Sequence, residues 1–278
     1  MTQSLPGTPP DPRVLIGSGP VLVDLDDGVA HVRLNRPEAS NGMNVPFLQA
    51  LFEALMRVHG EPRARAVLLT GEGPHFCAGG DVHTFAAQGE ALPDYLREAT
   101  TWLGHCASAL TRLEAPVVAA VHGYAAGGGG FGLVCAADLV VAGESAKFLL
   151  GATRVGMAPD AGGSVTLAKI VGLRKAMEIA LLNPTLSAAE AAELGIVNRV
   201  VPDDAVLAEG RALAGQLAQG ATRALAATKR LLWDGIGSTV EARLADESRT
   251  VSELSGTADA REGLAAVIEK RRPKFSGR

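Results

Sequence analysis

Two glycine-rich turns, each between a short apolar run and a helical pattern, constrain the fold of this chain most. The run Ala66–Thr70 leads into Gly71–Asp81, and the run Pro116–Val121 leads into Gly123–Gly132. A glycine-rich turn before a helix leaves backbone N–H groups without partners, and the helix dipole adds positive potential there. One such turn could bind a phosphate or serve only close backbone packing. Two converging turns could place two N–H donors on one oxygen, which would form an oxyanion hole.

The order of the remaining patterns predicts an α/β fold. Strand and helix patterns alternate from residue 21 to about 203, beginning with a β-hairpin signal at Asp26-Asp27-Gly28. Residues 204–278 read as one helix after another and predict a separate helical C-terminal region. Residues 1–20 contain five prolines and no periodicity, which predicts a flexible N-terminal arm.

Composition excludes several classes of partner. The 278 residues carry a net charge of −4, whereas nucleic-acid and anionic-membrane partners require clustered basic charge. No apolar run approaches the ~18 residues of a membrane span, and the first residues lack a signal-peptide pattern. Three scattered cysteines without a C-x-x-C pair predict neither disulfides nor a zinc site. We therefore expect a cytoplasmic protein without a metal, a nucleic-acid partner or a membrane partner.

Other glycine-dependent sites fit the sequence less well. Gly127, Gly129 and Gly132 match the dinucleotide fingerprint G-x-G-x-x-G, and Glu144 lies near the expected ribose-binding acid. However, another glycine turn precedes this one by ~50 residues, and the helix before Asp138 is too short for a typical crossover. Zincin, serine-hydrolase and P-loop patterns do not occur in the sequence.

Six segments in order resemble the crotonase family, also called the enoyl-CoA hydratase/isomerase family. They are Asn35–Ala39, Phe76–Asp81, Gly123–Gly132, Ala137–Ala142, Gly156–Gly163 and Glu269–Phe275. The resemblance extends from about residue 21 to residue 275. It implies a spiral of β-β-α units whose helical C-terminal region serves trimerisation and covers the active site. It also implies homotrimers or dimers of trimers, and acyl-CoA thioester substrates whose coenzyme A is part of the substrate rather than a separate cofactor.

The resemblance further assigns two oxyanion donors, the N–H of Gly80 and that of one glycine in the second turn. Counting back from Asp138 selects Gly129, whereas counting forward from Gly123 selects Gly128, because this run holds one residue more than the family pattern. We prefer Gly129, since a helix register is harder to shift than a loop.

The same resemblance assigns the residues that would bind coenzyme A. The stretch Glu38, Ala39 and Ser40 would line the channel together with Ala78 and Val82, near the oxyanion residues Gly80, Gly128 and Gly129. Lys274 and Phe275 would contact coenzyme A across a subunit boundary. Tyr124 could reach the pocket with its hydroxyl or pack under the glycine run. Asp81 borders the channel and is expected chiefly to order its loop, and His75 and His83 are expected on the surface.

The acid and base groups distinguish the members of this family. Its hydratases use two carboxylates, but those positions are Gly132 and Ala152 here, which disfavours simple hydration. Asp160 stands where the family's double-bond-shifting and 1,2-epoxyphenylacetyl-CoA isomerases carry an acid, and where its aryl-CoA dehalogenases carry a nucleophile. Alternatively, Asp160 caps a helix that begins at Ala161.

These observations favour an enoyl-CoA isomerase with Gly80, Gly129 and Asp160 as catalytic residues. A single carboxylate suits a proton shuttle, because it can take a proton from one carbon and return it to another while the enolate stays in the hole. A hydratase with a non-standard acid and a catalytically silent acyl-CoA binder stay open as alternatives.

Overall fold

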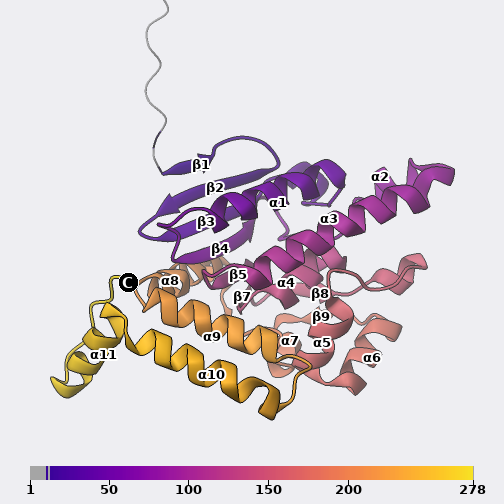
Figure 1. The fold of residues 1–278 in the computed structure, drawn as a ribbon. Coiled ribbons are helices and arrows are strands. Elements are labelled where there is room, and N and C mark those ends of the chain that lie inside the picture. The colour runs from indigo at the N-terminus through magenta and orange to yellow at the C-terminus, as the bar shows by residue number, and fades with distance from the viewer. Residues whose placement is uncertain (1–10, 12, 278) are drawn as a thin grey trace, which may run out of the picture.

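A seven-stranded sheet forms the centre of the fold in the computed structural model, which describes Asp11 and residues 13–277 (Figure 1). Its strands lie in the order β1 (Val14–Ile16), β2 (Val21–Asp26), β3 (Val29–Leu34), β4 (Ala66–Gly71), β5 (Val117–Val121), β7 (Leu139–Gly143) and β10 (Arg199–Val201). The strands β1, β2 and β3 pair antiparallel, and every pair from β3 to β10 is parallel. The carboxyl ends of β3, β4, β5 and β7 therefore lie at one edge of the sheet.

The N-terminal part of the sheet confirms one prediction and corrects another. Asp27 and Gly28 join β2 to β3 with φ angles of 44° and 81°, the left-handed values that a tight hairpin turn requires. In contrast to the arm expected over residues 1–20, the apolar triplet Val14–Ile16 adds an edge strand to β2. Residues 1–10 and 12 of that arm lie outside the described residues.

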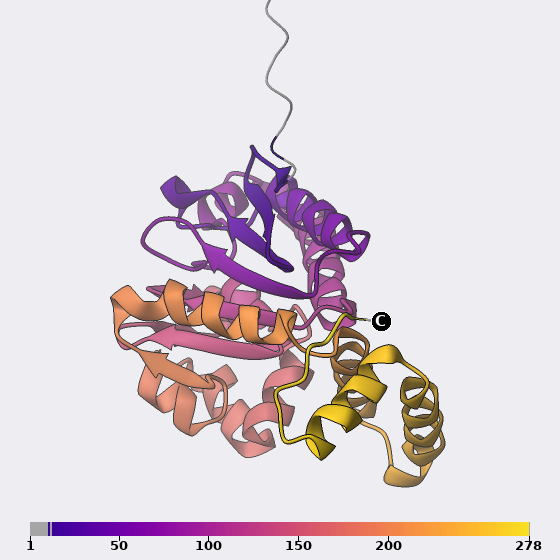
Figure 2. The ribbon, with the colours of Figure 1, turned by 90° about the vertical axis from the view of Figure 1, so that its left-hand side faces the viewer.

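Helices cover both faces of the sheet. Side chains alternate along each strand, so each central strand contributes apolar residues to a core on either face. Val67, Leu69 and Val117 face a core built with α1 (Val45–His59) and α3 (Leu92–Arg112). Ala66, Leu68 and Val118 face the opposite side, where α8 (Val206–Ala218) packs on β4, β5 and β7 (Figure 2). The boundary expected at residue 203 thus does not separate α8 from the core.

A second sheet carries the other half of each β-β-α unit. It contains β6 (Tyr124–Ala126), β8 (Lys147–Leu149) and β9 (Leu186–Ser187). After β5 the chain enters β6 and then a helical turn, and after β7 it enters β8, so these two units contribute one strand to each sheet. The predicted α/β class is confirmed. Helices α2 (Val82–Ala86), α4 (Leu133–Ala136), α5 (Gly163–Val171), α6 (Leu173–Leu182) and α7 (Ala188–Glu193) follow these strands.

Three further helices complete the chain, namely α9 (Thr222–Gly235), α10 (Val240–Ser255) and α11 (Ala258–Ile268). They lie beside one end of the core, and α11 leads to the C-terminus (Figures 1 and 2). Within the described residues, no helix has the length and apolarity that crossing a bilayer demands.

A buried ion pair fastens α9 to the core. The Lys229 ammonium lies 2.8 Å from Oδ2 of Asp138 and also donates to the carbonyl of Leu110. The Asp138 carboxylate accepts two further hydrogen bonds, from Val117 N–H and from the indole N–H of Trp233. Burial lowers the pKa of Lys229, and the carboxylate opposes this shift. Removal of one charge would leave the other buried without its partner.

We therefore expect Lys229→Ala to lower the free energy of unfolding by about 3 kcal/mol. Urea denaturation followed by circular dichroism measures the change. Lys175→Ala, which breaks an exposed pair with Glu178, serves as the control and should cost less than about 0.5 kcal/mol. Equal losses in the two variants would contradict the fastening role of Lys229.

Candidate active site

The first glycine turn is attached to the second by backbone pairing. The amide of Cys77 donates to the carbonyl of Tyr124 over 3.0 Å, and the amide of Ala126 donates to the carbonyl of Cys77 over 2.9 Å. The chain after β4 thus runs beside β6 and continues the small sheet. A Cβ placed on Gly127 would lie 3.3 Å from Cα of Gly79 and 3.9 Å from N of Gly80. The two turns therefore converge at the point where each leads into a helix.

The second turn continues as a π-helical turn, η3, at Gly128–Gly132. A π turn holds one residue more than an α turn, so it accommodates the additional residue of this glycine run. Gly128 is half-buried, whereas Gly129 is buried, and a Cβ on Gly129 would lie 2.8 Å from Sδ of Met43.

Gly80 presents an unpaired amide at this junction. On either side of it, the Gly79 carbonyl accepts from Met43 N–H, and the Asp81 amide donates to the Met43 carbonyl. Within the described part of the chain, the Gly80 amide has no acceptor of its own. The ring of Phe85 packs against Cα of Gly80 and occupies the space that a side chain there would fill.

The side chain of Asn41 fixes the first turn through hydrogen bonds. Its fully buried side-chain amide donates to the carbonyls of Glu72, His75 and Phe76 over 2.9–3.1 Å, and its oxygen accepts from Arg36 N–H. This positioning role was not predicted. The Asn-Gly pair at 41–42 signals a turn, but only the folded chain shows which carbonyls the amide meets.

Asp81 orders the start of α2. Its carboxylate accepts from Thr84 N–H over 3.0 Å and lies 2.8 Å from Nη1 of Arg36. Burial would raise the pKa of Asp81, but the bonds from Thr84 and the pairing with Arg36 outweigh it and lower the pKa to about 2. This arrangement agrees with the expected loop-ordering role.

Asp160 does not cap a helix. The following helix, α5, begins at Gly163 after the left-handed residues Ala161 and Gly162, and its N-terminus receives no side-chain capping bond. The capping alternative is therefore wrong. Instead, the carboxylate lies against Gly128, where an added Cβ would be 1.7 Å from Oδ1 of Asp160. Burial raises the pKa of Asp160, and a hydrogen bond from its own amide only partly opposes this shift.

Gly132 and Ala152 stand at the two positions where the resemblance implies the carboxylates of a hydratase, and neither side chain can carry a proton. A Cβ on Gly132 would lie 2.8 Å from Cβ of Ala161, so a side chain at 132 has no room without displacing the Asp160 segment. Ala152 begins the short helical turn η4 (Ala152–Val155). Phe131, the neighbour of Gly132, is fully buried against Phe148.

Comparison with known proteins identifies this arrangement of turns. The family model described as enoyl-CoA hydratase/isomerase matches residues 24–278. The chain belongs to the enoyl-CoA hydratase/isomerase family. It is 42% identical to a probable enoyl-CoA hydratase of Rhodobacter capsulatus over 93% of this chain and 98% of the relative. It is 36% identical to the 1,2-epoxyphenylacetyl-CoA isomerase of Escherichia coli, with the same coverage of both chains.

Solved structures in this family show the same fold. The crystal structure of a putative enoyl-CoA hydratase from Streptomyces coelicolor matches all of both chains with a TM-score of 0.89 and 32% identity. The spiral of β-β-α units is therefore the crotonase fold, and the chain is an enzyme of this family.

The residues expected to line the family's coenzyme A channel lie beside the first turn. Ser40 follows the short turn η1 (Pro37–Ala39), and its carbonyl accepts from Ala78 N–H over 3.0 Å. Glu38 pairs with Arg36 at 3.8 Å, and Ala78 and Val82 are exposed. Ser40 and Ala78 thus pair directly, and the short turn that holds Glu38 and Ala39 leads into Ser40.

Three other residues that were expected to bind coenzyme A lie away from the first glycine turn. Tyr124 is exposed and packs edge-on against His75, so it does not lie under the glycine run. The ring of Phe275 packs on Gly263, and the amide of Lys274 donates to Glu262 on α11. Figure 1 places α11 on the side opposite α2, so one chain does not bring its own Lys274 and Phe275 to the turns.

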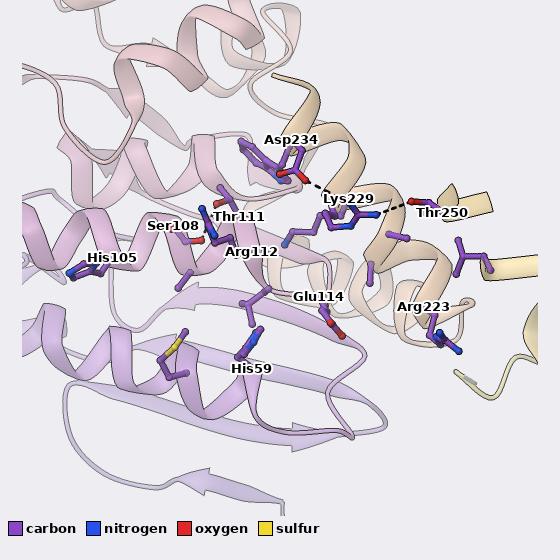
Figure 3. A pocket seen from close by; sticks show the side chains of 18 of the residues that line it. His59, His105, Ser108, Thr111, Arg112, Glu114, Arg223, Lys229, Asp234 and Thr250 are labelled. Atoms are coloured by element: carbon purple, nitrogen blue, oxygen red, sulfur yellow. Dashed lines mark hydrogen bonds and ion pairs between the residues drawn. The ribbon is translucent and has the colours of Figure 1, made fainter. Parts of the chain in front are cut away.

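A separate groove of about 980 Å³ lies between α1 and α3 on one side and α9 and α10 on the other (Figure 3). Its lining includes His59, Arg112, Lys229 and Arg230, and none of the predicted site residues. Lys229 pairs with Asp138, and Arg230 bonds to Thr250 and pairs with aspartates. This groove is a junction between the core and the C-terminal helices.

The lowered pKa of Asp81 predicts a pH-dependent contribution to stability. Its carboxylate stabilises the fold above the unfolded-state pKa near 4, and this contribution disappears as the pH falls through the folded-state value of about 2. The difference in unfolding free energy between wild type and Asp81→Asn should thus shrink between about pH 4 and pH 2.

Urea denaturation at a series of pH values measures this difference. Asp94→Asn, at an exposed carboxylate paired with Arg97, controls for the loss of one charge. A difference for Asp81→Asn that stays constant across this range would contradict the assigned role.

Proposed function

We propose that the chain is an enoyl-CoA isomerase that shifts a double bond or opens a ring epoxide, with Asp160 as its acid and base. One observation carries this proposal: the Asp160 carboxylate lies against Gly128, at the convergence of the two glycine turns, while positions 132 and 152 hold no acid. The similarity to the epoxyphenylacetyl-CoA isomerase supports the same reading.

The oxyanion hole would consist of the amides of Gly80 and Gly128. Gly129 is the choice when residues are counted from the helix and Gly128 when they are counted from Gly123, and the π-helical turn η3 begins at Gly128. Gly128 is also the more accessible of the two glycines and the one that contacts Asp160. These observations favour Gly128 as the second donor.

The chemistry follows from charge stabilisation. Removal of a proton from the carbon next to the thioester places negative charge on the thioester oxygen, and two preorganised amides stabilise that enolate. Loss of one donor from comparable holes costs about 3 kcal/mol. In a double-bond shift, Asp160 would take the proton from C2 and return it to C4. A raised pKa suits this exchange, because it makes the carboxylate a stronger base.

Hydration of a 2-enoyl-CoA is the alternative, because the relative at 42% identity is named a probable enoyl-CoA hydratase. Hydration requires a group that activates water and a group that protonates the α-carbon. Asp160 alone would have to perform both tasks, since Gly132 and Ala152 supply no proton-transfer group.

Asp160→Asn tests the proposal, because the amide cannot accept the proton. We expect kcat/KM for conversion of 3-enoyl-CoA to 2-enoyl-CoA to fall by roughly 10²- to 10⁴-fold. A spectrophotometric assay of the conjugated thioester measures this rate. Unchanged calorimetric binding of a saturated acyl-CoA confirms that the variant keeps its site.

The other outcomes of these activity and binding measurements would contradict the proposal. Full isomerase activity in Asp160→Asn would exclude Asp160 as the acid and base. Hydration of 2-enoyl-CoA by the wild type without isomerisation would identify a hydratase. Binding of acyl-CoA without turnover of either substrate would identify a silent binder.

We further propose that the family's trimeric assembly, as a trimer or a dimer of trimers, completes the site. Lys274 and Phe275 lie away from their own chain's glycine turns, so a neighbouring subunit would have to supply them. The C-terminal helices also expose apolar side chains that an interface would cover, namely Val240, Leu244, Val251, Leu264, Val267 and Ile268. Sedimentation velocity should give three or six times the mass of one chain, and a monomer would contradict this proposal.

A further inference from the structure

Leu103 is the apolar side chain closest to the junction of Gly128 and Asp160. It lies on α3 and is almost fully buried. A Cβ placed on Gly128 would meet three atoms, namely Oδ1 of Asp160 at 1.7 Å, Cγ of Asp160 at 2.6 Å and Cδ2 of Leu103 at 3.0 Å. The carboxylate and the Leu103 methyl group therefore lie over the same glycine and adjoin each other.

We propose that Leu103 is a positioning residue that holds the half-buried Asp160 carboxylate over Gly128 and shields it from water on the side of α3. The inference rests on the proposed function of Asp160 as acid and base. The absence of a side chain at Gly128 leaves space for the carboxylate, and the branched side chain of Leu103 closes that space from α3. Without Leu103, water could solvate the carboxylate, and the carboxylate could move away from the glycine.

The charged groups on the surrounding elements have partners elsewhere or lie in solvent, so they do not set the environment of the Asp160 carboxylate. On α3, Arg97 pairs with Asp94, Glu98 is exposed, and His105 stacks with Phe52 and Trp102.

On η4, the Arg154 guanidinium donates to the Asn183 carbonyl, and on α5, Lys169 is exposed. The segments η3 and α4 contain one titratable side chain, Cys135, whose pKa burial raises to about 12, so it stays neutral. Desolvation is thus the main influence on the Asp160 carboxyl.

The contact with Leu103 would affect the pH range in which Asp160 acts as a base. A desolvated carboxyl keeps its proton to higher pH than a solvated one. If water reaches Asp160, the acid limb of the pH–rate profile should move to lower pH, and the carboxylate should become a weaker base.

Three substitutions on α3 separate positioning from general packing. Leu103→Ala opens the space beside Asp160, and Leu103→Met keeps an apolar side chain of similar volume. Leu110→Ala removes an equally buried leucine two turns further along the same helix, about 10 Å from position 103.

The ¹³C shift of the Asp160 carboxyl, assigned with Asp160→Asn, reports its titration without requiring turnover. The pH dependence of kcat/KM for 3-enoyl-CoA is measured in parallel.

We expect the Asp160 titration midpoint and the acid limb to fall by about one pH unit in Leu103→Ala and to stay in place in Leu103→Met and Leu110→Ala. An unchanged midpoint in Leu103→Ala would overturn this inference. If that variant does not fold, a midpoint in Leu103→Met equal to the value for a solvated aspartate would overturn it equally. Loss of the proposed function is distinguishable, because it would appear as full isomerase activity in Asp160→Asn whatever the titration shows.

Discussion

The pairing of Cys77 with β6 is the constraint on which the site depends. Two backbone hydrogen bonds align the loop after β4 with Tyr124–Ala126, so that Gly79 meets Gly127 almost backbone to backbone. Side chains at these glycines would separate the two segments. Because β4 and β5 are adjacent parallel strands, their carboxyl ends lie side by side. The pairing of Cys77 with β6 then aligns the two loops that follow these strands. The proposed site can then combine amides from two segments that lie far apart in the sequence.

The π-helical turn at Gly128–Gly132 brings the second glycine segment against the segment that carries Asp160. Gly127, which precedes the turn, lies against Gly79 and Gly80, and the turn packs Gly132 against Ala161. That contact excludes a carboxylate at position 132 and fixes the segment that carries Asp160. In the proposed mechanism, the half-buried Asp160 carboxylate beside two amides would move one proton between two carbons of the same substrate.

Local signals predicted much of the fold from the sequence. The Asp27-Gly28 hairpin and the alternation of strands with helices follow from short-range chemistry, and the structure agrees. The strand β1 was missed, because an apolar triplet among prolines becomes a strand only when a sheet edge is available to it. The place of α8 was missed because an apolar helical face does not tell which surface it covers.

The sequence predicted the type of site, two glycine turns with a nearby carboxylate, but it did not predict the contacts that these residues make. Glycine content and spacing predicted two turns, but the choice between Gly128 and Gly129 depends on where the additional residue is absorbed, and this is a property of helix geometry. The alternatives for Asp160 also depended on geometry, because a left-handed Ala161 moves the helix start to Gly163 and frees the carboxylate. Asn41 and Leu103 act through long-range contacts, for which the sequence contains no local signal.

A crystal structure of the protein with a saturated acyl-CoA, which binds but cannot isomerise, tests the central claim most directly. The account predicts that the thioester oxygen lies within about 3 Å of the amide nitrogens of both Gly80 and Gly128, with Asp160 facing the carbon next to the thioester. A thioester oxygen that meets only one of these amides, or lies in a different cavity, would contradict it.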